Sequence, residues 1–231
     1  DYPDDASPNG QKNYTYTGNG GVPLGSVFSR LLFAIHYQEQ RILLSNLINS
    51  ESKIIFNRSP RERVAKVAPW LQIDGDPYPA IINNRIVWIV DGYTTSASYP
   101  YSRTVDLTGV TTDSLNVNTN PLTATPNAKI NYIRNSVKAT VDAYNGTVTL
   151  YAWDENDPIL KTWSKAFPGS VKAKSEMSAG LISHVRYPED MFRVQRDVLS
   201  LYHVTNASAF YGGQDRSEEH TSELQSPYVI S

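Results

Sequence analysis

Apolar residues recur at helical spacing near the start of the chain. Between residues 24 and 35 they occupy Leu24, Val27, Phe28, Leu31, Leu32 and Ile35. Steps of three and four residues place such side chains on one side of a helix. Pro23 stands just before the run, where a first helical turn tolerates proline. The pattern predicts a helix with one apolar face, followed by a second apolar set that continues toward Asn49.

Another helix start is visible at residues 59–62 (SPRE). Serine serves as an N-cap, proline fits the first turn, and a glutamate three residues after the serine completes the pattern. We expect this helix to run to about Leu71. The next residues, Asp74-Gly75-Asp76-Pro77, are typical of a turn.

Two β-rich runs come next. Ala80–Ile82 and Arg85–Val90 are joined by Asn83-Asn84, and two residues of this type between strands favour a tight hairpin. The second strand is predicted to end at Asp91-Gly92. Residues 104–128 are polar and without periodicity, which is typical of a long mobile loop.

A second hairpin is predicted around Asn145-Gly146, between SVKATVDAY and TVTLYAW. Helical patterns then cover residues 157–167, 175–187 and 189–204. Strand pairs followed by helices are typical of α+β folds rather than alternating α/β folds. We therefore predict an α+β fold of antiparallel strand hairpins with packed helices.

Composition narrows the class of protein. Apolar residues make up 40% of the chain and charged residues 19%, which excludes disorder throughout. The absence of cysteine excludes disulfides, thiolate metal sites and cysteine nucleophiles. The longest strongly apolar run, Leu31 to Ile35, is far shorter than the roughly 20 residues of a membrane-spanning helix. We expect any membrane attachment to lie outside this sequence.

Residues 216–231 (RSEEHTSELQSPYVIS) differ in character from the rest. Arg216 to Ser226 match one reading frame of a common sequencing-library adapter, and Ile230 and Ser231 match codons further along it. We predict that residues 1–215 form part of one globular domain and that residues 216–231 are a non-native tail. Without the tail, acidic and basic side chains balance, so the net charge gives no indication of nucleic-acid binding.

The most suggestive acidic residues are Asp74, Asp76 and Asp91. If the hairpin brings Asp91 close to Asp76, these carboxylates offer the oxygen ligands that a hard cation such as calcium requires. The same carboxylates could serve as acid and base in a hydrolase or transferase. Aspartate and glycine are also ordinary turn residues, so a purely structural role stays open.

The second candidate site is the aromatic set Tyr93, Tyr99 and Tyr101, in a segment rich in threonine and serine. Aromatic faces beside hydroxyl groups suit contacts with sugars and with partner proteins. The alternative is that these tyrosines pack against the open face of the hairpin.

Other motifs indicate structure rather than chemistry. Residues 154–157 (DEND) lack the spacing of a helix–loop–helix calcium site, and we predict a turn in which Asp157 caps the helix that begins at Pro158. The sequence holds no G-x-S-x-G motif, no phosphate-binding glycine motif and no paired histidines at zinc-ligand spacing. We therefore expect no cofactor.

Long, ordered motifs give a resemblance to a known family. These runs are VPLGSVFSRLLFA, SPRERVAKVAPWL, DGDPYPA, RIVWIVDGYTTSASYPYS, NYIRNSVKATVDAYNGTVTLYAWDENDPILKTWSKAFPG and RYPEDMFRVQRDVLSLYHV. Over nearly all of residues 1–215 the chain resembles the uncharacterised protein family 0182 of bacterial, mainly actinobacterial, multi-pass membrane proteins.

The resemblance implies placement but no chemistry. Members have an N-terminal set of membrane helices and then a large domain outside the cytoplasmic membrane, within which this chain would lie. The parent protein would then sit in the plasma membrane, with its own transmembrane region and an envelope component as partners. Three hypotheses follow: a non-enzymatic extracytoplasmic module for envelope transport or assembly, an envelope hydrolase or transferase that uses Asp74, Asp76 or Asp91, and a carbohydrate- or lipid-binding surface module.

Overall fold

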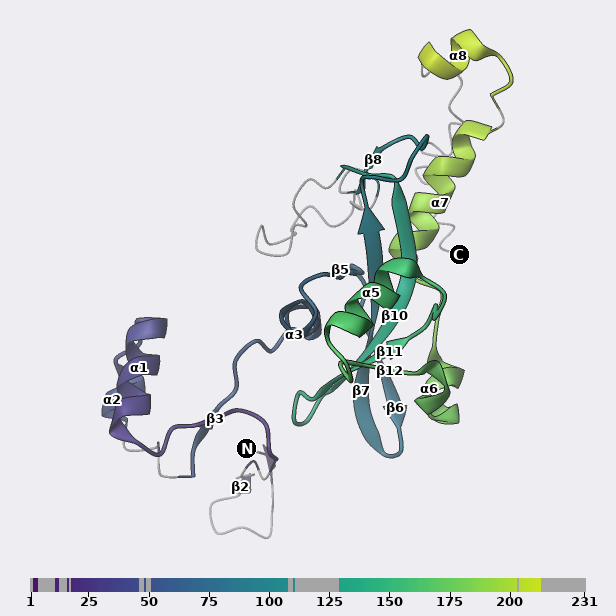
Figure 1. Cartoon of the computed structure of the whole chain (residues 1–231). Helices are drawn as coiled ribbons and strands as arrows, with labels where there is room; N and C mark the ends of the chain where they lie inside the picture. Colours follow the sequence, from purple (N-terminus) through teal and green to yellow (C-terminus); the bar gives the residue numbers. More distant parts are fainter. Residues whose placement is uncertain are drawn as a thin grey trace, which may run out of the picture.

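The computed structural model describes residues 2–3, 11–12, 16, 18–45, 48, 51–107, 110, 129–202 and 204–212. It contains antiparallel hairpins and packed helices, so the predicted α+β class is confirmed (Figure 1). Within these residues, no helix combines the length and the apolar character that crossing a membrane requires. The predicted tail, residues 216–231, lies outside the described residues, as do residues 108–109 and 111–128 of the predicted loop.

A six-stranded sheet forms the centre of the described structure, with β7 and β10 as its longest strands. Its strands are β5 (Gln72–Ile73), β6 (Tyr78–Ile82), β7 (Arg85–Ser96), β10 (Tyr132–Asp142), β11 (Val148–Ala152) and β12 (Val171–Lys172). The order is β12-β11-β10-β7-β5, and β6 also pairs with β7. All pairs are antiparallel except β11 with β12.

Both predicted hairpins are confirmed. Asn83 and Asn84 connect β6 to β7 with φ angles of 51° and 60°, the left-handed conformation that asparagine tolerates in two-residue hairpin turns. In the second hairpin, Gly146 has a φ of 72° between β10 and β11. The turn residues Asn83, Asn84 and Gly146 therefore set the register of the two strand pairs.

The predicted end of the second strand at Asp91-Gly92 is wrong, because β7 continues to Ser96. Its last residues pair with the start of β10, and Tyr93 also pairs with Gln72 of β5. A register shift between Asn135 and Val137 marks a β-bulge opposite this stretch. Gly92 does not end the strand. Its missing side chain leaves room for Leu71, whose Cδ1 would lie 3.0 Å from a Cβ at position 92.

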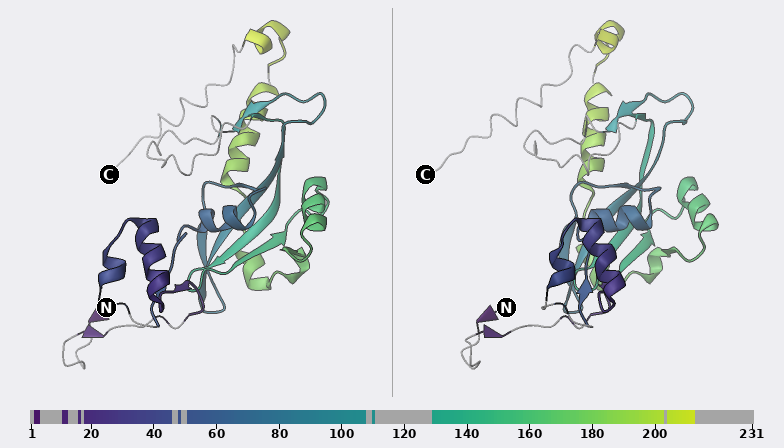
Figure 2. Two further views of the ribbon diagram at one scale, coloured as in Figure 1. Left: turned by 60° about the vertical axis from the view of Figure 1, so that its left-hand side comes forward. Right: turned by 90° about the vertical axis from the view of Figure 1, so that its left-hand side faces the viewer.

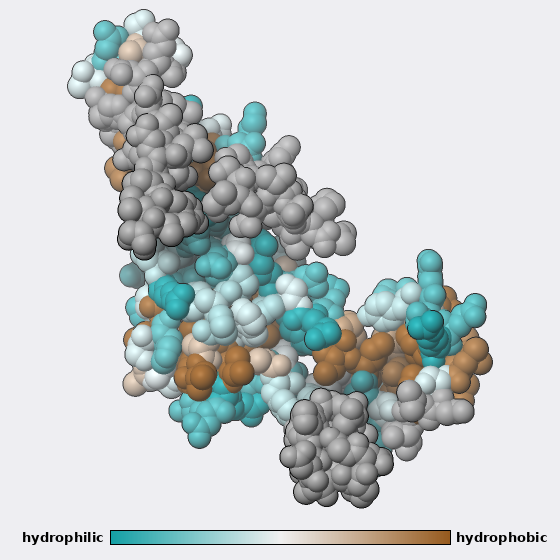
Figure 3. Space-filling model, turned by 180° about the vertical axis from the view of Figure 1, so that it is seen from behind, coloured by the Kyte–Doolittle hydropathy of each residue, from teal (hydrophilic) through white to brown (hydrophobic). Residues whose placement is uncertain are grey.

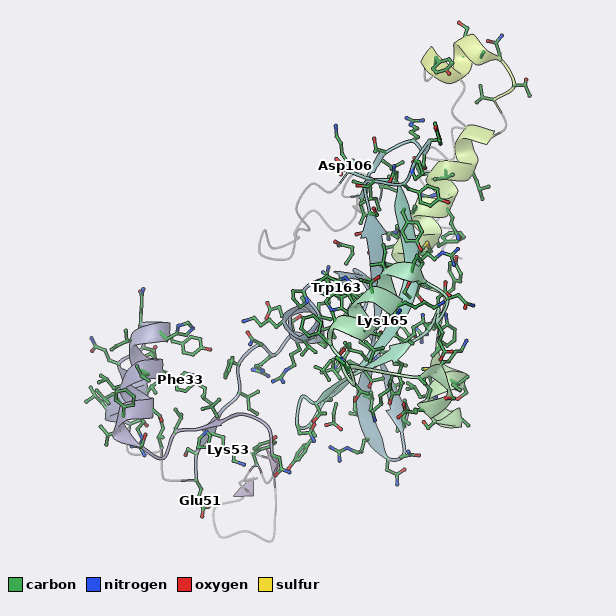
Figure 4. All side chains as sticks on the ribbon, in the orientation of Figure 1. Phe33, Glu51, Lys53, Asp106, Trp163 and Lys165 are labelled. Atoms are coloured by element: carbon green, nitrogen blue, oxygen red, sulfur yellow. The ribbon has the colours of Figure 1, made fainter. Side chains whose placement is uncertain are left out.

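One face of the sheet packs on α3 (Pro60–Val67) and α5 (Pro158–Ala166). Successive residues of a strand point to opposite faces, so Val90 joins this core while Ile89 joins the other. The main core contains Val64, Ala68, Leu71, Ile73, Val90, Val137, Ala139, Val141, Leu150 and Leu160. Trp163 of α5 stacks on Trp70 at a centroid distance of 5.5 Å (Figure 4).

The opposite face packs on α6 (Ala179–His184), and α7 (Glu189–Tyr202) lies along the upper end of the sheet in Figure 1. Two predicted helices are shorter than expected. Because a residue before proline avoids the helical region, α3 ends before Pro69 instead of at Leu71. The predicted helix 175–187 is divided into η1 (Lys174–Glu176) and α6, because Ser178 caps a new helix.

A helical hairpin projects from the sheet (Figures 1 and 2). It consists of α1 (Val27–Tyr37) and α2 (Arg41–Leu44), and the segments that flank it form β3 (Val22–Pro23) and β4 (Lys53–Ile54). The helix predicted from residue 24 onward is therefore present, but its apolar face is exposed. The remaining short elements are β1 (Tyr2–Pro3), β2 (Gln11–Lys12), β8 (Val105–Asp106), β9 (Lys129–Ile130) and α8 (Ala207–Gly212).

Candidate functional site

A cavity of about 350 Å³ lies where the N-terminal end of α7 meets the sheet. Its lining combines carboxylates, one arginine and several aromatic rings: Asp74, Asp76, Tyr78, Asp91, Arg186, Tyr187, Pro188, Glu189 and Phe192. The three acidic residues singled out from the sequence therefore share one cavity. The pairing of β5 with β7 causes this, because it sets Asp74 beside Asp91, whose carbonyl accepts a hydrogen bond from the Asp74 N–H at 2.9 Å.

In the lining of the cavity, Asp91 of β7 forms a buried ion pair with Lys138 of β10. The two residues face each other directly in the strand register. Their side chains are 3% and 1% exposed. The Lys138 Nζ also donates to the Arg186 carbonyl at 3.0 Å, and Asn135 Nδ2 donates to Asp91 Oδ1 at 2.9 Å. A lysine on a central strand thus ties the sheet to the segment that precedes α7.

Burial perturbs both members of this pair. Removal from water disfavours charge, so burial raises the pKa of Asp91, although Lys138 acts in the opposite direction. Burial likewise lowers the pKa of Lys138, and the Asp91 charge opposes that change. Each charge offsets the cost of burying the other, since either group alone would be strongly disfavoured as a charge at this depth.

A second set of bonds joins Asp74 to the start of α7. The Tyr93 hydroxyl donates to Asp74 Oδ2, and that oxygen also accepts the Asp190 N–H at 3.2 Å. The Asp76 N–H donates to Asp74 Oδ1 at 2.8 Å, and the Met191 N–H donates to the Tyr93 hydroxyl at 3.2 Å. Both carboxylate oxygens of Asp74 therefore accept hydrogen bonds from the fold, and one of the donors, the Asp190 N–H, belongs to the first turn of α7, where backbone N–H groups have no acceptor within the helix.

Asp190 completes the connection from the helix side. Its Oδ2 accepts the Gly75 N–H at 2.8 Å. Burial raises the pKa of Asp190 to about 6, and the negative charge of Asp74 adds to the effect. We call Asp74, Asp91, Tyr93, Lys138 and Asp190 the buried polar cluster.

Tyr78 and Arg186 close the cavity on the α6 side. The Arg186 N–H donates to the Tyr78 hydroxyl at 2.9 Å, and the guanidinium carbon lies 4.7 Å from the centre of the Tyr78 ring. This geometry is typical of a cation–π contact. Burial raises the pKa of Tyr78, so its hydroxyl stays protonated and acts as a neutral hydrogen-bonding group.

Two of the three carboxylates of the predicted metal site already have partners within the fold. Asp91 is paired with Lys138, and Asp74 is bonded to Tyr93, so a cation would compete with existing partners. Among the residues that the structure describes, no group of three or more His, Cys, Asp or Glu side chains is arranged to hold a metal ion. Metal binding by Asp74, Asp76 and Asp91 stays a prediction.

The three predicted surface tyrosines have different environments. Tyr93 is buried in the polar cluster, where burial and the Asp74 carboxylate raise its pKa. Tyr99 is exposed and stacks on Tyr132 at a centroid distance of 5.8 Å, and Tyr101 is fully exposed. They share no common exposed face, because Tyr93 takes no part in the surface. Recognition by Tyr99 and Tyr101 stays a prediction.

Sequence reasoning missed Lys138, Asp190 and Asn135. A signal for the lysine was present, because alternation along SVKATVDAY places position 138 opposite the apolar face of Val137 and Ala139, on the side of Asp91. The role of Asp157 is confirmed: its Oδ2 accepts the Leu160 N–H at 2.7 Å as a helix N-cap. Tyr132 donates to the other oxygen of Asp157; burial, together with this hydrogen bond, raises the pKa of Tyr132 to about 12.

The family model and the curated relatives that match this chain point to one family. The model of an uncharacterised protein family, UPF0182, matches residues 1–231. A UPF0182 protein of Thermobifida fusca is 60% identical over 205 residues, which are 89% of this chain and 20% of the relative. One from Frankia casuarinae is 53% identical, covering 95% of this chain and 22% of the relative, and one from Bifidobacterium longum is 49% identical, covering 94% and 21%.

The chain thus spans about a fifth of the length of these curated relatives. No solved structure matches it. The family model covers the whole chain and several actinobacterial relatives share about half of its residues or more. The chain belongs to the uncharacterised protein family UPF0182.

Proposed function

We propose that this chain is a non-catalytic, extracytoplasmic region of a multi-pass bacterial membrane protein that serves envelope transport or assembly. The observation that carries the proposal is the internal bonding of the buried polar cluster. A general acid, general base or nucleophile must exchange protons or bonds with a substrate. Asp91 is instead bonded to Lys138, and Asp74 to Tyr93, so these groups join the sheet to α7.

The membrane setting of the proposal draws on the family. About four fifths of the length of the curated relatives lies outside the region that this chain matches. The motif resemblance implies that membrane helices occupy part of that length. A sheet with paired interior charges is a rigid unit that such a protein can hold outside its membrane region.

Labelling from outside the cell tests the placement. The chain contains no cysteine, so a single one can be introduced cleanly at the exposed Ser175. We would place the 205 matched residues of this chain in the Thermobifida fusca relative, in exchange for its own, and replace any other cysteine. A membrane-impermeant maleimide should label Ser175→Cys in intact cells as well as after lysis. A cysteine at the buried Ser136 is the matched control, which should stay unlabelled until denaturation. Labelling of Ser175→Cys only after lysis would contradict the proposal.

A second candidate function is an envelope hydrolase or transferase. The observation in its favour is that Asp74, Asp76 and Asp91 line one cavity with Arg186. Asp76 is exposed, in contrast to Asp74 and Asp91. If the cavity performs chemistry, Asp76 is therefore the carboxylate best able to meet a substrate. A substitution of Asp76 distinguishes the two functions. Because its side chain is exposed, the substitution should leave the fold intact, and a loss of function would indicate a role in chemistry.

A further inference from the structure

The α1–α2 hairpin presents a continuous apolar surface to solvent. Figure 3 shows hydrophobic residues gathered over this hairpin, apart from the body of the molecule. We call this the α1–α2 apolar surface; its members, with their exposed fractions, are Val27 (72%), Phe28 (69%), Leu31 (41%), Leu32 (52%), Ile35 (66%) and Leu44 (74%). Exposed apolar patches of this kind mark sites of interaction.

The opposite side of α1 is mixed, with Ser29 and Arg30 beside Phe33. Phe33 lies 6.1 Å from Phe56 and 6.2 Å from Tyr37 between ring centres, and Figure 4 shows Phe33 on α1. The apolar stripe of such a helix normally faces the core of a complete protein. The described residues of this chain partly cover the opposite side of α1 and leave the apolar stripe open.

Both ends of this helix are well defined in the described structure. Ser26 caps its start by accepting the Ser29 N–H at 3.0 Å, and Gln38 ends it in the left-handed conformation with a φ of 55°. The flanking segments are fixed to each other and to the body: Lys53 Nζ donates to the Gly18 carbonyl at 2.8 Å, and Arg63 donates to the Phe56 and Gly146 carbonyls. The surface is thus preformed, which lowers the entropic cost of docking.

We propose that the α1–α2 apolar surface docks against the remainder of the full-length protein, on an apolar surface formed by residues outside this chain. The rest of the same polypeptide can provide the covering surface, because this chain spans only about a fifth of the length of its relatives. The inference goes beyond the proposed function, since it holds on whichever side of the membrane the region lies.

A lipid surface is a poorer match to this face. Helices that lie in a membrane interface carry several lysines or arginines on their polar side. Within α1 the basic residue Arg30 is directed to the Leu24 carbonyl, to which its Nε donates at 2.9 Å. Arg41 of α2 lies 3.9 Å from the Glu39 carboxylate. The polar side of the hairpin therefore offers little net positive charge to anionic lipid.

Photo-crosslinking in the full-length protein tests the proposal. The chimera with the Thermobifida fusca relative would carry benzoylphenylalanine in place of Phe28, a close match in shape. Irradiation should join position 28 to peptides of the relative outside the matched region, identified by mass spectrometry. Benzoylphenylalanine at the exposed Ser175, on the body of the fold, is the matched control and should give at least severalfold less of this product.

Two polar substitutions separate docking from folding. Leu31→Gln with Ile35→Gln should reduce the cross-link from position 28 by about tenfold or more, because burial of each side chain contributes strongly to docking. In the isolated chain the same substitutions should leave the unfolding transition unchanged, since both side chains are exposed there. Cross-links confined to lipid, to a second copy or to this chain's own sheet would overturn the proposal, as would the absence of any product.

Discussion

Removing the charge of Lys138 measures how much the buried polar cluster contributes to the stability of the fold. The Lys138→Met variant keeps the length of the side chain but leaves Asp91 buried without its cation. Breaking a buried ion pair by removing one partner costs about 3–5 kcal/mol. In a protein of this size, that loss lowers Tm by about 6–20 °C. The Arg186 carbonyl also loses the hydrogen bond that it accepts from Lys138.

Urea unfolding of the chain measures this effect, with two further variants. Lys138→Met combined with Asp91→Leu removes both charges, so the double variant should recover most of the lost stability. Arg85→Met breaks the more exposed pair with Asp142, whose atoms lie 2.8 Å apart, and should cost under about 1 kcal/mol. A cost of Lys138→Met no larger than that of Arg85→Met, or a double variant less stable than the single one, would contradict a mutually stabilising buried ion pair.

Three further substitutions test individual contacts. Burial raises the pKa of Asp190 to about 6, so its protonation should stabilise the fold fully below the ordinary aspartate pKa of about 4, and this contribution is lost as pH rises through 6. Asp190→Asn should remove this pH dependence of the free energy of unfolding in urea. An unchanged pH profile would contradict the prediction. Asp157→Ala should lower the free energy of unfolding by about 1 kcal/mol or more through loss of the cap on Leu160, whereas an unaltered midpoint would show that the cap is dispensable. Asn84→Ala should cost about 1–2 kcal/mol in thermal unfolding, because alanine resists a φ of 60°, while Asn84→Gly should be neutral or stabilising; equal behaviour of the two variants would argue against the turn.

The sequence predicted what depends on local pattern. Both hairpins could be found because asparagine and glycine adopt the left-handed turn conformation and the flanking residues favour strands. The Asp157 cap could be found for the same reason, since a cap satisfies backbone groups only a few residues away. These features need no information from distant parts of the chain.

What the sequence could not predict depends on contacts between distant segments. Gly92 by itself predicts a strand end, yet pairing with β10 extends β7 to Ser96. The sequence around Tyr93 predicts a surface residue, but Asp74 and α7 cover it. Lys138 was overlooked because a buried lysine requires a carboxylate on a neighbouring strand, and that partner is 47 positions away in the sequence.

We propose that this region is a structural part of a larger protein and not an enzyme. The test uses a Thermobifida fusca strain that lacks its UPF0182 gene and is complemented by the chimera carrying Asp76→Asn. If the exposed Asp76 carboxylate takes part in no reaction, this variant should reverse the deletion phenotype as fully as the unsubstituted chimera. Loss of complementation, with the variant protein present at normal amounts, would contradict the account and favour chemistry in the cavity.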